Sequence, residues 1–164
     1  MSTEARSGAT SLARTARVLL RIIVSEVLFE ETSPSVIVVA HSERTPSDEE
    51  FDALFELVDR VVDQYGYAKL LVRAEGSGGP GAHQRKRLAR TEWSGRLQIA
   101  LCTESPTIRG IGTALKWLGL SRIRTFGPHE LNLAVRFLGL EEVIAEHTLR
   151  RLHQMHQKIS GAAA

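Results

Sequence analysis

Segment 36–40 restricts the fold more than any other part of the sequence. It reads Val-Ile-Val-Val-Ala, an apolar run dominated by β-branched residues without the alternation of a half-exposed strand. Such runs are typical of strands that are covered on both faces, as in α/β proteins. The chain therefore needs helices on both sides of a sheet, and 164 residues are enough for one domain of that kind.

The clearest helix signal comes after this strand. Ser47 and Glu50 have the spacing of a capping box, in which each side chain accepts a backbone N–H of the other residue. Apolar residues then recur at helical spacing until Gly66, which we expect to end the helix. These apolar positions are Phe51, Leu54, Phe55, Val58, Val61, Val62 and Tyr65.

Strands and helices alternate along the rest of the chain. The expected strands are 26–30, 36–40, 69–73, 96–102 and 121–126, with a turn at 32–35, and the expected later helices are 82–92, 105–118, 127–139 and 141–159. Short connections between such elements favour parallel neighbours with right-handed crossovers. The sequence thus predicts an α/β fold with a single mixed, mostly parallel sheet of about five strands, an antiparallel starting hairpin, helices packed on the sheet, and N- and C-terminal flanking helices.

These elements form one domain, predicted over 11–160 with its core at about 26–139. Residues 1–10 are rich in Ser, Thr, Gly and Ala, which predicts disorder, and 161–164 are expected to form a frayed tail. Segment 12–24 has arginines at helical spacing, which favours a helix. Its β-branched residues 22–24 also suit a strand, so helix and strand remain alternatives for this segment.

One cysteine, Cys102, excludes an internal disulfide and fits a reducing cytoplasm. Its apolar surroundings favour a small buried side chain rather than a nucleophile. The most apolar stretch, 18–29, contains Arg21 and Glu26 and is shorter than the roughly 20 residues that a spanning helix needs. We therefore expect a cytoplasmic protein without a membrane span.

The chain resembles the STAS-like domains, in particular the SpoIIAA-like branch of anti-sigma-factor antagonists. The resemblance covers about residues 26–139, through the hairpin, the acidic helix, the strands near 70–72 and 96–101, and the segment 124–127 before a helix. It implies a bacterial regulatory domain of signal transduction that acts by protein–protein contact. Antagonist members carry a phosphorylatable Ser followed by Gly after the middle strand, and Ser77 and Gly78 stand there, although Glu75-Gly76 replaces the usual Asp-Ser or Asp-Thr before them.

A glycine-rich loop surrounds Ser77. It satisfies the pattern G-x-G-x-x-G between a strand and a helix, where backbone amides and a helix start can hold a phosphate, and Glu104 ends the next strand where a ribose-binding acid would stand. Pro80 removes one amide, however, and the loop follows the third strand rather than the first. A phosphate or small-ligand site and a flexible connection are the alternatives for these residues, which are Gly76, Ser77, Gly78, Gly79 and Gly81.

The charges are segregated along the chain. Segment 43–63 holds eight acids and two bases, whereas the next helix carries Arg85, Lys86, Arg87 and Arg90. We predict that these four residues bind a protein partner, with a solvated face or self-association through opposite charges as alternatives. Nucleic acid is less favoured, because Trp93 is the single aromatic residue nearby.

The last helix carries His147, His153 and His156, of which His153 and His156 face one side, but metal binding needs a third ligand with suitable geometry, and no Cys, Asp or Glu completes the set. The same helix has a mostly apolar stripe at 4-3-4 spacing, formed by Thr148, Leu152, Met155 and Ile159. We expect this stripe either to pack on the domain or to pair with a second copy of the chain.

Neither a nucleophile triad nor a pair of carboxylates for acid–base chemistry stands out, and no cofactor is expected. The leading interpretation is a non-enzymatic binding or regulatory domain. Its alternatives are a nucleotide- or phosphate-binding enzyme that uses loop 76–81 and a self-assembling scaffold that uses its terminal helices.

Overall fold

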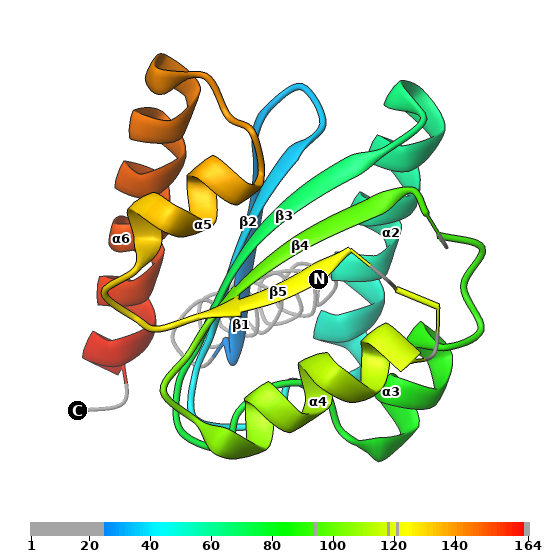
Figure 1. The fold of residues 1–164 in the computed structure, drawn as a ribbon. Helices are drawn as coiled ribbons and strands as arrows, with labels where there is room; N and C mark the ends of the chain where they lie inside the picture. The colour runs from blue at the N-terminus through cyan, green and yellow to red at the C-terminus, as the bar shows by residue number, and fades with distance from the viewer. Residues whose placement is uncertain (1–24, 94, 118, 121, 163–164) are drawn as a thin grey trace, which may run out of the picture.

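The computed structural model describes residues 25–162 apart from positions 94, 118 and 121. The predictions for residues 1–24 and 163–164 lie outside this part of the chain. One five-stranded sheet stands between two layers of helices (Figure 1). The strands are β1 (Val27–Ser33), β2 (Val36–His41), β3 (Ala68–Ala74), β4 (Leu97–Cys102) and β5 (Ile123–Phe126), and the helices are α2 (Asp48–Tyr65), α3 (Ala82–Leu88), α4 (Pro106–Trp117), α5 (Leu131–Phe137) and α6 (Glu142–Ala162).

The strands lie side by side in the order of the sequence, from β1 to β5. β1 is antiparallel to β2, and every later neighbouring pair is parallel. The predicted mixed, mostly parallel sheet with a starting hairpin is therefore confirmed. Helices α2, α3 and α4 cover one face of the sheet, and α5 and α6 cover the other (Figure 1).

Strand β2 shows why segment 36–40 is apolar throughout. Ile37 and Val39 pack into a core shared with α2, α3 and α4, whereas Val38 and Ala40 pack into a second core with α5 and α6. Successive side chains of a strand point to opposite faces, so both sets of positions must be apolar when both faces are covered. All four side chains are at most 1% exposed.

Helix α2 begins and ends as predicted. The Ser47 hydroxyl accepts the N–H of Glu50 at 3.2 Å, and Glu50 Oε2 accepts the N–H of Ser47 at 2.9 Å. Gly66 follows the last turn with φ of 82°, a left-handed conformation that glycine adopts without strain.

Several predicted boundaries differ from the structure; for example, α5 covers Leu131–Phe137 rather than 127–139. β1 continues to Ser33, so the turn is reduced to Pro34 and Ser35. α3 ends at Leu88 rather than 92, because the chain turns to bury Trp93, whose ring lies 4.7 Å from that of Phe55. α6 continues to Ala162 and includes part of the predicted frayed tail.

The apolar stripe of α6 packs on this same domain. Leu152, Met155 and Ile159 belong to the core with Val38 and Leu71, and Thr148 Oγ1 lies 3.2 Å from Thr32 Oγ1 of β1. Of the two interpretations of the stripe, packing on the domain is the one observed. Among the described helices, none combines the length and the apolar character that a membrane crossing requires.

Candidate functional site

The glycine-rich loop lies tightly on the segment that follows β2. A Cβ atom on Gly78 would lie 1.8 Å from the carbonyl oxygen of Ser42, so only glycine fits there. Gly76 and Gly79 have φ of 54° and 117°, which glycine adopts without strain. Ser77 is exposed between these fixed positions. Close backbone packing therefore accounts for Gly78, positive φ angles account for Gly76 and Gly79, and the loop presents Ser77 to solvent.

Gln84 of α3 anchors the loop to the rest of the domain. Its Oε1 accepts the N–H of Gly81 at 3.0 Å, and its Nε2 donates to the carbonyl oxygen of Pro46 at 2.9 Å and to Asp48 Oδ1 at 3.1 Å. The side chain is 3% exposed. The Gly81 amide is thus already bonded, and Pro80 has none, so two backbone positions expected to bind a phosphate do not offer a free N–H.

The four basic residues predicted on α3 divide into two pairs. Arg85 donates through Nη1 to the carbonyl oxygen of Pro80 at 2.8 Å, and Arg87 forms an ion pair with Asp52 and lies over the Phe55 ring. Lys86 and Arg90 are exposed and have no ion pair with any described residue. The first pair therefore holds α3 in place, and the second is free to meet a partner.

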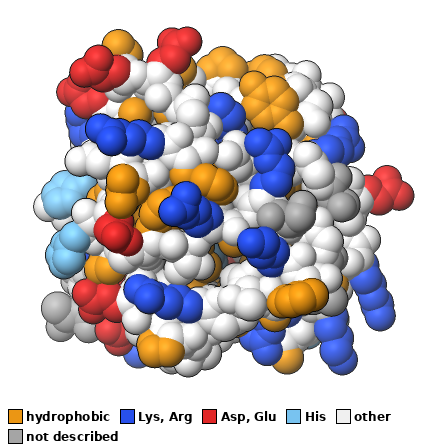
Figure 2. All heavy atoms as spheres, in the orientation of Figure 1, with side chains coloured by type: hydrophobic (Ala, Val, Ile, Leu, Met, Phe, Trp, Pro, Cys, Tyr) orange, Lys and Arg blue, Asp and Glu red, His pale blue; other side chains and the backbone are white. Residues whose placement is uncertain are grey.

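The charge of this region extends well beyond α3. Between residues 82 and 126 the chain carries nine Lys and Arg side chains and two Glu, a net charge of +7. Figure 2 shows Lys and Arg side chains gathered over the part of the molecule where α3 and α4 lie. Lys116 at the end of α4 and Arg122 before β5 are exposed.

Trp117 is the residue that sequence reasoning missed. It ends α4 with 87% of its surface exposed. Its signal in the sequence is the helical spacing of Ile108, Ile111 and Leu115, which places Trp117 off the apolar stripe of the helix. Leu115 of α4 belongs to the same apolar core as Leu88 of α3, so both helices pack on the same side of the sheet.

A hollow of about 320 Å³ lies at the carboxyl ends of the parallel strands, where ligands commonly bind in α/β sheets. Its walls include Arg73, Glu75, Glu104 and His129. Glu75 Oε1 lies 3.5 Å from Arg73 Nη2 and 3.0 Å from Nε2 of His156 on α6. No sequence pattern predicts this contact, because His156 and Glu75 are far apart in the chain.

Burial is the main cause of the pKa shifts of two ionisable groups near the hollow, His156 and Cys102. Burial lowers the pKa of His156, with Arg73 acting in the same direction and Glu75 against both. Burial also raises the pKa of the Cys102 thiol to about 12. Within the described residues, no group of three or more His, Cys, Asp or Glu side chains is arranged to hold a metal ion.

Comparison of the chain with protein-family models, with curated proteins and with solved structures gives no match. The resemblance to STAS-like domains therefore stays a prediction, and function has to be inferred from the residues and contacts described above.

Proposed function

We propose that the protein is a non-enzymatic binding domain that docks an acidic protein partner on the side of α3 and α4. The surface, named here the basic face, consists of Lys86, Arg90, Lys116, Trp117 and Arg122. The observation that carries the proposal is the 87% exposure of Trp117 in a region with a net charge of +7. Tryptophan and arginine are the residues that most often dominate the energy of protein interfaces.

The charge layout supports an acidic partner. A surface of one sign attracts a partner of the opposite sign over a distance of about 10 Å at ordinary ionic strength and orients it before contact. The Trp117 ring then supplies apolar area, which acidic residues alone cannot bury. Lys86 and Arg90 supply charges that no described residue neutralises.

The proposal of a non-enzymatic domain is supported by the contacts and burial of the ionisable groups. In the hollow at the strand ends, Glu75 already contacts both Arg73 and His156. Cys102 is fully buried and its pKa of about 12 keeps the thiol protonated. These groups therefore serve packing and charge pairing. A regulatory binding domain also agrees with what the STAS-like resemblance implies, and Ser77, exposed on the loop before α3, remains its candidate for phosphorylation.

The test uses a fluorescent peptide that alternates Glu with a few apolar residues. We expect micromolar binding by the wild-type chain that weakens as salt is added, and at least about tenfold weaker binding for Trp117→Ala and for the double variant Lys86→Glu/Arg90→Glu. Lys158→Glu is the matched control, because Lys158 is an exposed cation on α6, in the other helical layer.

Two results would contradict the proposal. Equal loss of peptide binding in Lys158→Glu would mean that net charge alone attracts the peptide. Tighter binding of a single-stranded oligonucleotide than of the peptide, with the same dependence on Trp117, would mean that the basic face serves a nucleic acid.

A further inference from the structure

The hollow at the carboxyl ends of the parallel strands contains a charge that the fold does not need, the guanidinium of Arg73. In the sheet, Arg73 lies in register between Ala40 of β2 and Cys102 of β4, and Phe126 of β5 follows in the same row. Side chains in one row of a sheet point to the same face. The other three side chains belong to the apolar core under α5 and α6, so Arg73 is a charged member of an apolar row.

The Arg73 guanidinium is poorly paired for its burial. Its side chain is 19% exposed, and its one ion pair among the described residues joins Nη2 to Glu75 Oε1 at 3.5 Å, beyond the usual length of a hydrogen bond. The same oxygen of Glu75 lies closer to Nε2 of His156, at 3.0 Å. Nε of Arg73 is buried without a hydrogen-bond partner among the described residues. A largely buried charge costs free energy that such contacts do not repay, and poorly paired charges of this kind gather at functional sites.

The guanidinium is accessible at its outer edge. Arg73 and Cys102 both line the hollow, and the charge of Arg73 opposes the effect of burial on the pKa of the Cys102 thiol, so the guanidinium lies near that wall. Nη1 has no hydrogen bond with a described residue and, unlike Nε, keeps some accessible surface. Nη1 and Nη2 together form the edge through which arginine binds a carboxylate with two parallel hydrogen bonds.

Acidic side chains around the same hollow disfavour a ligand that is only an anion. Glu43, in the segment after β2, and Glu104, in the segment after β4, line the hollow, and both are exposed without an ion pair to any described residue. With Glu75, they place three carboxylates around one guanidinium. A ligand with a carboxylate alone is repelled by these groups, whereas an added ammonium group pairs with them.

We propose that this hollow binds a small zwitterion of amino-acid size, whose carboxylate pairs with Arg73 and whose ammonium group pairs with Glu43 or Glu104. The volume of about 320 Å³ suits a ligand of that size, since it is near the lower end of the range for small-molecule sites, roughly 300–1,000 Å³. The carboxyl ends of parallel strands are also where α/β proteins commonly bind ligands. The proposal is independent of the partner assigned to the basic face.

The test compares two zwitterions that differ in charge spacing, L-alanine and γ-aminobutyrate, with compounds that carry one of the two charges. Propionate and ethylamine are the counterparts of L-alanine, and butyrate and propylamine are those of γ-aminobutyrate. With the chain labelled with ¹⁵N, we expect one or both zwitterions to shift the amide resonances of Gly76 and Glu104 at millimolar concentration or below. The amides of Ala68 and Leu97, at the other ends of β3 and β4, should not move.

Affinity should depend on both charges of the ligand. We expect a zwitterion to bind at least about tenfold more tightly than each of its single-charge counterparts. Absence of shifts at Gly76 and Glu104 with both zwitterions would overturn the proposal. Equal affinity for the carboxylate alone or for the amine alone would also overturn it, because the site would then recognise one charge only.

The variants assign the roles of Arg73 and the two free acids. Arg73→Gln should weaken binding of the zwitterion at least about tenfold, and Arg73→Lys, which keeps the charge without the planar fork, should lie between it and the wild type. Arg60→Gln is the matched control, because Arg60 is an exposed arginine of α2 in the other helical layer. Unchanged affinity in Arg73→Gln would remove Arg73 from the site.

The double variant Glu43→Gln/Glu104→Gln changes two exposed side chains, so it leaves the packing of the domain intact. It should weaken the zwitterion and should not weaken its carboxylate counterpart, since only the ammonium group loses its partners. Unweakened binding of the zwitterion in this variant would contradict the assignment of the ammonium group.

Discussion

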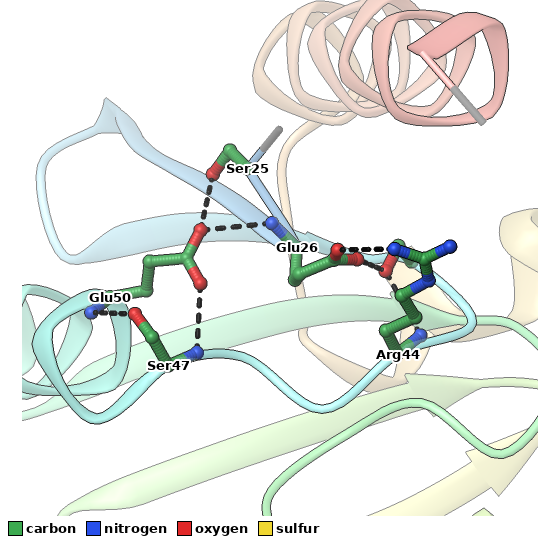
Figure 3. A network of polar contacts seen from close by, with 6 residues as sticks. Ser25, Glu26, Arg44, Ser47 and Glu50 are labelled. Carbon is green, nitrogen blue, oxygen red and sulfur yellow. Dashed lines mark hydrogen bonds and ion pairs between the residues drawn. The ribbon is translucent and has the colours of Figure 1, made fainter. Parts of the chain in front are cut away.

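Glu50 accepts the backbone N–H of Glu26 at 2.9 Å, so a carboxylate in the first turn of α2 holds the residue before β1 (Figure 3). The same oxygen accepts the Ser25 hydroxyl at 2.9 Å, and the other oxygen completes the capping box with Ser47. Glu26 in turn accepts the hydroxyl of Ser42. One carboxylate therefore serves as a helix cap and as a contact between the first strand and the first described helix.

Replacing Glu50 with alanine should lower the free energy of unfolding by about 1–2 kcal/mol, because it removes a cap and a tertiary hydrogen bond. Partial burial raises the pKa of Glu50, but the hydrogen bonds from Ser47, Glu26 and Ser25 outweigh this and hold the pKa below its ordinary value. The stabilisation is therefore present above the ordinary pKa and is lost as pH falls through the lowered one. Urea denaturation at neutral and acidic pH measures both effects. Glu56→Ala, at an exposed position of the same helix, is the control, and an equal loss there would contradict the expectation.

Two glycine substitutions should act in opposite directions. Gly78→Ala should destabilise the protein by several kcal/mol, about 3 or more, because its Cβ would collide with the Ser42 carbonyl oxygen. Gly110→Ala, in α4 with open space around it, should stabilise by about 0.5–1 kcal/mol through helix propensity. Thermal denaturation distinguishes them, and a tolerated alanine at 78 would mean that the loop does not lie on the segment after β2.

His41 should make the protein less stable in acid. Its pKa is lowered from 6.5 to about 4, so between these values the unfolded chain binds a proton that the folded chain does not. Stability therefore falls as pH drops from 6.5 towards 4, by roughly 3 kcal/mol from this group. The difference in free energy of unfolding between wild type and His41→Leu should change by that amount over this range. A difference that does not vary with pH would show that His41 titrates normally.

Cys102 should react with alkylating agents only when the domain unfolds. It is fully buried, and burial raises the pKa of its thiol to about 12. We expect modification by iodoacetamide at pH 8 to be on the order of a thousandfold slower in buffer than in denaturing urea. Mass spectrometry over time measures the two rates, and fast labelling of the folded protein would contradict the burial of β4.

The sequence predicted those helices and strands whose formation depends on residues close together in the chain. The capping box at Ser47 and the apolar segment 36–40 each specify one element with little help from elsewhere. The end of α3 was predicted wrongly, because the residues up to 92 suit a helix and the burial of Trp93 against Phe55 is what stops it. Tertiary packing thus overrode helix propensity at that point.

The candidate site likewise has some features that the sequence predicts and others that only the fold creates. Basic residues on α3 are visible in the sequence, but which of them stay free depends on two contacts. Arg87 pairs with Asp52, which only the fold brings near, and Arg85 donates to the carbonyl oxygen of Pro80. The contact between Glu75 and His156 and the hollow beside Arg73 both form between elements that are distant in the chain. No pattern of spacing in the sequence reports such contacts.

The strand order has a consequence for how the chain acquires its structure. Because each strand pairs with the strand before it, the sheet can grow in the direction of synthesis, from the hairpin to β5. The last helix, α6, then returns to β1 and β2, where Arg151 pairs with Glu30. Within the described residues, one face of the first hairpin therefore stays uncovered on the ribosome until α6 emerges. We therefore expect nascent chains that end before α6 to depend on chaperones, and the final folding step to be the closure of α6 over the hairpin.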